Sequence, residues 1–187
     1  MSGNAQAVVQ NSKKYAYLLL LMRHAAAKPG EYNGDRERVL SMEGLDQAER
    51  IGATLSQLSL IPDRIVCSGS ARTRQTLDQM LDLFGDDPHV DYRESLYSDG
   101  TQAVFDQLAV TKANEHTLLI VAHEPAMSMG AQLLSDIHTD AKLMRKLNLG
   151  LSPANVAILA SDHPFGEWNM HGSQLLGILN PKDMVEP

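Results

Sequence analysis

A short apolar run that ends in a charged pair constrains the fold of this chain more than any other feature. Residues 17–22 read YLLLLM, and Arg23 and His24 follow directly. A run of this length without polar alternation predicts a strand that is buried on both faces, as in the middle of a parallel sheet. Ligands of such sheets bind beyond the carboxyl ends of the strands. Arg23 and His24 therefore stand where a ligand is expected.

Further strands alternate with amphipathic helices along the rest of the chain. Strands are expected at residues 64–67, 90–93, 117–122, 156–159 and 174–179, and helices at 41–58, after 70, after 101, after 125 and at 140–147. This alternation predicts an α/β fold, a three-layer α/β/α sandwich with a mainly parallel central sheet. Between the first strand and the first helix, the composition of residues 28–38 predicts a loop beside the site.

The length of 187 residues suits one domain with a substantial core. Residues 1–14 are polar and lack periodicity, so we expect a flexible N-terminal tail followed by a single domain over 15–187. The net charge of −7 argues against nucleic acid as a partner, because no basic field covers the whole molecule.

The location of the protein is expected to be cytoplasmic. The only cysteine, Cys67, leaves no disulfide framework, which is typical of a reducing compartment. The lysines at positions 13 and 14 precede an apolar run as in a signal peptide, but Arg23 and His24 interrupt that run before the alanines. No run approaches transmembrane length, so we expect no membrane partner.

Histidines and arginines follow three of the expected strands. Two of these strands end at His24 and His123, and the third precedes Arg72. If the three strands are neighbours, these side chains and Arg23 converge on one pocket. Guanidinium groups match phosphate oxygens with a planar fork, and the helices that begin after these strands add backbone N–H donors. The residues predict a site for a dianionic phosphoryl group.

At these positions the chain resembles the histidine phosphatase superfamily, also called phosphoglycerate mutase-like. The Arg-His pair at 23–24 resembles its signature, 68–76 resembles its Ser-Pro-x-x-Arg-Ala-x-Gln-Thr segment, and 123–125 resembles the part with its second histidine. Residues 38–44 further resemble the Arg-Pro-Leu-Thr-x-x-Gly of the SixA-type phosphohistidine phosphatase branch. The departures, Ala25 for glycine and Gly69 and Val39 for prolines, remove no phosphate ligand.

The resemblance implies a role for each site residue. His24 would be the nucleophile, forming a phosphohistidine intermediate that water hydrolyses. Arg38 would add a contact from the loop, and Glu94 stands where many members place the proton donor to the leaving group. No metal or other cofactor is expected, because cationic side chains supply the positive charge. Three residues would clamp the phosphoryl oxygens and stabilise charge during transfer: Arg23, Arg72 and His123.

Cys67 raises the alternative of a cysteine-dependent phosphatase, in which an arginine follows the cysteine by six positions. That position holds Thr73, with arginines at 72 and 74, so the spacing fails on both sides. Cys67 is instead expected to be a small, buried strand residue.

The interval between Glu94 and His123 bears on the substrate. Members of the family that act on small metabolites often carry a long insertion over the site here, whereas this chain has 28 residues between the two positions. An uncovered site favours phosphohistidine on another protein, whose labile phosphoramidate bond needs little help from an acid. Two alternatives stay open: a phosphatase of small phosphate esters or nucleotides, and a non-catalytic phosphate-binding module.

Overall fold

Six strands form one sheet in the computed structural model, which describes residues 2–30, 34–85 and 88–183. The strand order is β3-β2-β4-β1-β5-β6. The parallel strands are β1 (Tyr17–Arg23), β2 (Arg64–Ser68), β3 (His89–Arg93) and β4 (Thr117–Ala122), whereas β5 (Val156–Ser161) runs antiparallel to both β1 and β6 (Gln174–Leu179). The prediction of a mainly parallel central sheet is confirmed.

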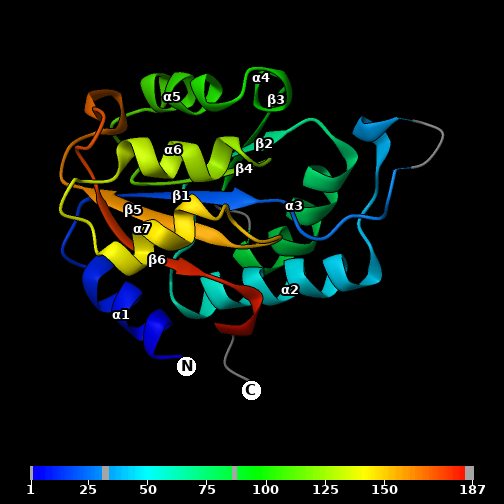
Figure 1. Cartoon of the computed structure of the whole chain (residues 1–187), viewed down its shortest axis with the longest axis horizontal. Helices are drawn as coiled ribbons and strands as arrows, with labels where there is room; N and C mark the ends of the chain where they lie inside the picture. The colour runs from blue at the N-terminus through cyan, green and yellow to red at the C-terminus, as the bar shows by residue number, and fades with distance from the viewer. Residues whose placement is uncertain (1, 31–33, 86–87, 184–187) are drawn as a thin grey trace.

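Helices cover both faces of this sheet (Figure 1). One face is covered by α2 (Met42–Gln57) and α3 (Ala71–Phe84), and the other by α5 (Thr101–Val110), α6 (Ala126–Leu134) and α7 (Ala141–Asn148). The short helix α4 (Ser95–Ser98) follows β3. These layers confirm the predicted α/β/α sandwich. Within the described ranges, none of the helices is both long and apolar enough to cross a membrane.

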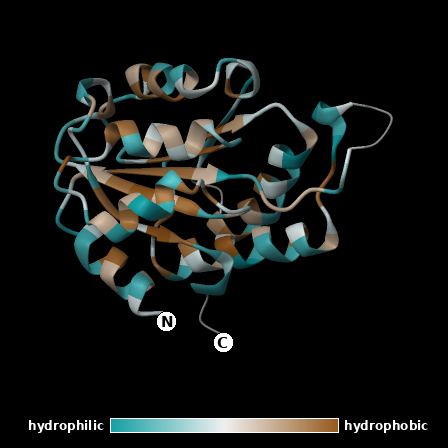
Figure 2. Cartoon of the chain, viewed as in Figure 1, coloured by the Kyte–Doolittle hydropathy of each residue, from teal (hydrophilic) through white to brown (hydrophobic). Residues whose placement is uncertain are grey.

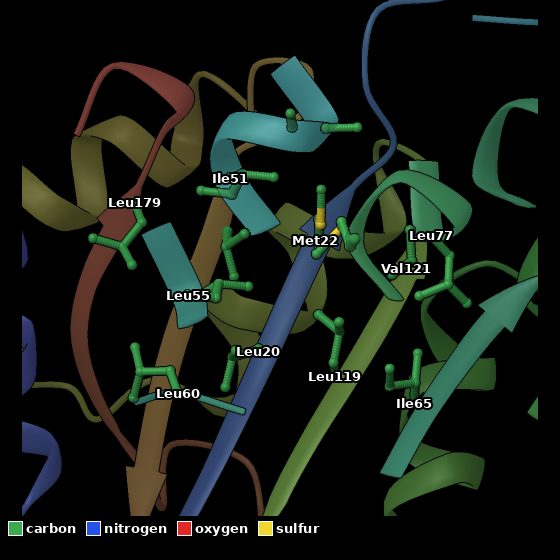
Figure 3. Packing of buried hydrophobic residues seen from close by; sticks show 14 of the residues in the cluster. Leu20, Met22, Ile51, Leu55, Leu60, Ile65, Leu77, Leu119, Val121 and Leu179 are labelled. Atoms are coloured by element: carbon green, nitrogen blue, oxygen red, sulfur yellow. The ribbon is translucent and has the colours of Figure 1, made fainter. Parts of the chain in front are cut away.

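The strand β1 contributes to two apolar cores, one on each face of the sheet. Leu20 and Met22 belong to the cluster under α2 and α3, and Figure 3 shows them on the side of the sheet that Ile51 and Leu55 of α2 cover. Leu19 and Leu21 belong to the cluster under α5 and α6, and all four side chains are fully buried. Figure 2 shows the strands as the apolar centre of the molecule. Because burying one such side chain contributes about 1.5–3 kcal/mol, the unbroken apolar run stabilises both layers.

The N-terminus differs from the prediction of a flexible tail over residues 1–14. Gly3–Ser12 forms helix α1, and the side chains of Ala5 and Val8 are fully buried against the sheet beside β6. Gly177 of β6 makes this approach possible, since a Cβ there would lie 2.6 Å from Cγ2 of Val8. The prediction failed because the helix buries only two apolar side chains, Ala5 and Val8, which give no clear periodicity in the sequence. Their packing against the neighbouring strand is enough to stabilise this short helix.

Candidate active site

The three strands that were expected to carry the site are neighbours in the sheet, in the order β2-β4-β1. Because they are parallel, their carboxyl ends meet at one edge, to the right in Figure 1. His24 directly follows β1, His123 directly follows β4, and Arg72 lies in the first turn of α3 after β2. The two imidazole rings lie edge to face with their centroids 5.2 Å apart. The predicted convergence of these residues is therefore present.

Arg72 joins the two histidines. Its Nε donates to Nε2 of His24 at 3.2 Å, and its Nη2 donates to Nδ1 of His123 at 3.3 Å. The side chain is only 7% exposed, so this guanidinium is held in place by its surroundings. Since a guanidinium is only a donor, each of these two ring nitrogens must carry a lone pair.

His24 is consequently a neutral imidazole with a defined tautomer. Its Nδ1 lies 2.7 Å from the carbonyl oxygen of Ala25, which can only accept, so Nδ1 carries the proton. Burial lowers the pKa of His24 to about 4, and the nearby charges of Arg72 and Arg23 act in the same direction. At neutral pH, Nε2 is therefore an unprotonated nitrogen next to the guanidinium, as a nucleophile requires.

His123 is neutral as well. Its Nδ1 accepts from Arg72, so Nε2 donates to Oγ of Ser68, the last residue of β2, at 2.9 Å. Burial, followed by the charge of Arg72, lowers the pKa of His123 to about 3. The ring of Tyr97 stands edge-on to this imidazole, with centroids 5.4 Å apart. Tyr97 was not predicted, because nothing local in the sequence distinguishes it.

Arg23 reaches the site from the end of β1. Its Nη1 donates to the carbonyl oxygen of Leu151 at 2.8 Å, which orients the guanidinium. Its Nε is buried and has no hydrogen-bond partner in the described part of the chain. An unsatisfied buried donor costs about 1–3 kcal/mol. An oxyanion bound at this place would satisfy it.

Arg38 lies close to the site through an acidic neighbour that was not predicted, Asp35. Nη1 of Arg38 lies 3.0 Å from Oδ1 of Asp35, while Oδ2 of Asp35 accepts from Nη2 of Arg72 at 2.9 Å and from the hydroxyl of Tyr97 at 3.1 Å. The hydrogen bonds from Arg38, then Arg72, lower the pKa of Asp35 to about 2. Of the expected site loop 28–38, residues 31–33 lie outside the described residues. The loop was recognised, but this carboxylate within it was not.

Glu94 lies at the start of α4, and its side chain is 54% exposed. Both of its carboxylate oxygens accept from Arg36, and this pairing lowers the pKa of Glu94. Gly69 makes room for the pair, since a Cβ at that position would lie 3.0 Å from Oε2 of Glu94. In this arrangement the carboxylate is ionised and has no proton to give. The role of Glu94 as proton donor stays a prediction.

The Gln-Thr end of the motif at 68–76 holds the neighbouring loops. Oγ1 of Thr76 accepts from the backbone N–H of Ala25 at 3.0 Å, and Oε1 of Gln75 accepts from that of Leu40 at 2.8 Å. Helix α3 therefore sets the backbone on both sides of the loop that carries Asp35.

Cys67 is fully buried in β2, as expected, and burial raises the pKa of its thiol to about 12. A thiol this weakly acidic is a poor nucleophile. Among the described residues, no group of three or more histidine, cysteine, aspartate or glutamate side chains is arranged to hold a metal ion.

Known proteins resemble the chain in sequence and in structure. Residues 19–96 match the model of the histidine phosphatase superfamily, branch 1. An uncharacterised protein of Mycobacterium tuberculosis is 31% identical over 139 residues, which cover 74% of this chain and 85% of the relative. A solved structure from Nakamurella multipartitia, assigned to the phosphohistidine phosphatases as a SixA, is 28% identical with a TM-score of 0.76, over 88% of this chain and 96% of its own. The protein histidine phosphatase SixA complexed with tungstate shares the fold at 18% identity, with a TM-score of 0.72 over 89% and 98% of the two chains.

Proposed function

Because the chain belongs to the histidine phosphatase superfamily, as a SixA-type member, and is a phosphatase, we propose that it hydrolyses phosphohistidine on other proteins, with His24 as the nucleophile. One observation carries the proposal. The proton of His24 is held on Nδ1 by the carbonyl oxygen of Ala25, so the lone pair of Nε2 lies beside Arg72 in the pocket. Two further predicted ligands of the phosphoryl group, Arg23 and His123, support it from the adjacent strand ends.

In the first step, Nε2 of His24 releases its hydrogen bond from Nε of Arg72 and attacks the phosphorus, and the bond from phosphorus to the substrate's imidazole nitrogen breaks. The released imidazole takes its proton from water. The new phosphohistidine keeps its Nδ1 proton, and the carbonyl oxygen of Ala25 stabilises the positive charge that the ring acquires. Arg23 and Arg72 compensate the negative charge on the phosphoryl oxygens throughout the transfer.

In the second step, water attacks the phosphorus and the bond to Nε2 of His24 breaks. The ring returns to its neutral form, inorganic phosphate leaves, and the proton of the water passes to phosphate or solvent. His123 is neutral, with a proton on Nε2, so in this scheme it acts as a hydrogen-bonding ligand. Arg38 contributes a further positive charge from the loop.

The proposal of a protein substrate is supported by the segment between Glu94 and His123. It forms α4, α5 and β4, and α5 packs against α6 and the turn Phe165–Glu167. Figure 1 shows α5 stacked on α6 over one face of the sheet, away from the tip of β1. Apart from α4, whose Tyr97 stands against His123, the segment thus builds the outer layer of the sandwich and adds no insertion over the strand ends, which suits a bulky phosphorylated partner. Nucleic acid and membranes are not proposed as partners.

A phosphatase of small phosphate esters or nucleotides is the second candidate, and one cavity favours it. A cavity of about 940 Å³ adjoins Ala26 and Leu151, next to the backbone that positions the site. Its lining carries three cations, Arg50, Lys146 and Lys182, and two carboxylates, Glu43 and Asp46, and Arg50 is paired with Asp46 at 2.9 Å. A leaving group of moderate size would fit there.

The test is a rapid quench in alkali, which preserves phosphohistidine, after mixing with a protein that carries labelled phosphohistidine. Label is expected on the wild type and on the control His138→Ala, whose histidine is exposed, and is expected to be absent from His24→Ala. Full turnover by His24→Ala would refute the nucleophile.

Parallel assays on a panel of small phosphate esters test the substrate. Turnover of the panel far above that of the phosphohistidine protein would make the second candidate the better one. Tight phosphate binding without turnover of any substrate would indicate a non-catalytic binding module.

A further inference from the structure

The carboxylate of Asp35 pairs with Arg72 and Arg38. In a phosphate-binding site, these arginines would be expected to stay free for the substrate. Its backbone carbonyl oxygen accepts from Nη1 of Arg72 at 2.6 Å, and its Oδ2 accepts from Nη2 at 2.9 Å. Oδ1 of the same carboxylate pairs with Arg38, and the hydroxyl of Tyr97 also donates to Oδ2. One short turn, Asp35–Glu37, thus engages two of the arginines assigned to the phosphoryl group.

We infer that Asp35 is a built-in competing anion, whose carboxylate occupies Arg72 in the free protein and is displaced by the phosphoryl group of the substrate. The inference rests on the proposed role of Arg72 in binding that group. It adds a residue that sets which anions the site accepts.

The contacts of Arg72 show why both anions cannot bind it together. Its Nε donates to His24, its Nη1 to the carbonyl oxygen of Asp35, and its Nη2 to Asp35 and to His123. The N–H groups with which the guanidinium could form two parallel hydrogen bonds to a phosphoryl group thus already have acceptors. A phosphoryl group next to Nε2 of His24 would place its oxygens beside an ionised carboxylate, and the two like charges would repel.

The exposure of the two side chains shows which of them moves. Arg72 is 7% exposed and lies on a helix, whereas Asp35 is 54% exposed and lies on a single turn in a loop. An exposed carboxylate regains hydration when it leaves, but a buried guanidinium without a counter-charge is costly. The exchange therefore consists of Asp35 leaving as the phosphoryl group arrives, with Arg72 paired in both states.

This exchange predicts discrimination between anions. A monoanionic carboxylate ligand would replace one carboxylate by another and would gain little. A phosphoryl dianion brings a second negative charge and three acceptor oxygens, so it gains hydrogen bonds to Arg72 and Arg38 that the carboxylate of Asp35 alone cannot make.

The experiment compares the binding of inorganic phosphate and acetate to the wild type, Asp35→Asn and Glu37→Gln, by calorimetry at constant ionic strength. Asp35→Asn removes the charge with little change in shape, and Glu37→Gln removes one exposed charge from the same turn. For Asp35→Asn we expect phosphate to bind about tenfold more tightly, which corresponds to about 1.4 kcal/mol. We also expect acetate to become a detectable ligand and the KM for a phosphohistidine protein to fall. For Glu37→Gln we expect changes below about twofold, because Arg72 keeps its carboxylate.

Unchanged or weaker phosphate binding by Asp35→Asn would overturn the inference, and Asp35 would then be a residue that orients Arg72. An equal gain in both variants would also overturn it, since net charge alone would explain the result. A wild type that neither binds phosphate nor hydrolyses a phosphohistidine protein would refute the proposed function instead, so the two failures are distinguishable.

Discussion

Replacement of Arg72 by lysine tests the chemistry of the site most directly. The substitution keeps a positive charge but removes the planar fork of the guanidinium. In the structure, Arg72 donates from Nε to His24 and from Nη2 to His123, and it donates to Asp35 from both terminal nitrogens. An ammonium group is a single point with three donors, so it cannot reach all of these partners at once.

The size of the effect follows from the contacts that are lost. Loss of one donor that stabilises developing charge in an active site typically costs about 2.7–4 kcal/mol of transition-state stabilisation. Since lysine would retain one contact and the charge, we expect kcat to fall by a factor of about 10²–10³. His24 keeps its hydrogen bond to Ala25, so its tautomer should be unchanged. The fold should survive, because the stem of lysine fills much of the space of the buried side chain.

The assay is single-turnover hydrolysis of a phosphohistidine protein, with unfolding by denaturant as the check on stability. The matched control is Arg74→Lys, on the same helix. The guanidinium of Arg74 is exposed and stacks on Tyr92 at 4.7 Å, away from the histidines. A rate for Arg72→Lys within threefold of the wild type would refute the reasoning, as would an equal loss in the control.

Three further changes test other parts of the structure. Glu94→Gln should slow hydrolysis of phosphohistidine less than about threefold, because the ionised carboxylate holds no proton; a loss of about 10² or more in kcat would identify it as the proton donor. Gly44→Ala should lower the free energy of unfolding by about 2–3 kcal/mol in a denaturant titration, since its Cβ would lie 1.9 Å from the carbonyl oxygen of Ala26; an unchanged midpoint would contradict this packing. The ring resonances of His24 and His123 should remain those of neutral imidazole at pH 5.5 in an NMR titration, because burial lowers their pKa values to about 4 and about 3. Unfolded histidines titrate near pH 6.5, so below that pH the unfolded state binds more protons than the folded state, and stability should fall as the pH is lowered from 6.5 to about 3. A midpoint near 6.5 for both rings would be inconsistent with the site.

Much of the site could be predicted because its residues sit at positions defined by local patterns. His24 and His123 each follow an unbroken apolar run, and such a run in this fold class is a central strand. The carboxyl ends of parallel strands meet at one edge, so knowing that both runs are strands was enough to bring the rings together. Cys67 was predicted to be buried for the same reason, from its place within a strand.

Other features required contacts between distant segments, which no local pattern reports. The helix Gly3–Ser12 exists because β6 offers a glycine opposite Val8, more than 160 positions along the chain. Asp35 contacts Arg72 only because the loop after β1 returns over the start of α3. A charged residue in a loop belongs to no periodic pattern, so the sequence does not indicate which way its side chain points.

The sequence by itself determined the alternation of strands and helices after residue 14, the apolar layers and the residue types at the strand ends, because each depends on near neighbours in the chain. Only the tertiary structure decided the protonation of the site. The proton of His24 lies on Nδ1 because Arg72 and Ala25 approach opposite sides of one ring, and burial by surrounding elements keeps that ring neutral. A tautomer is set by partners in space, and one of these partners lies 48 positions away in the chain.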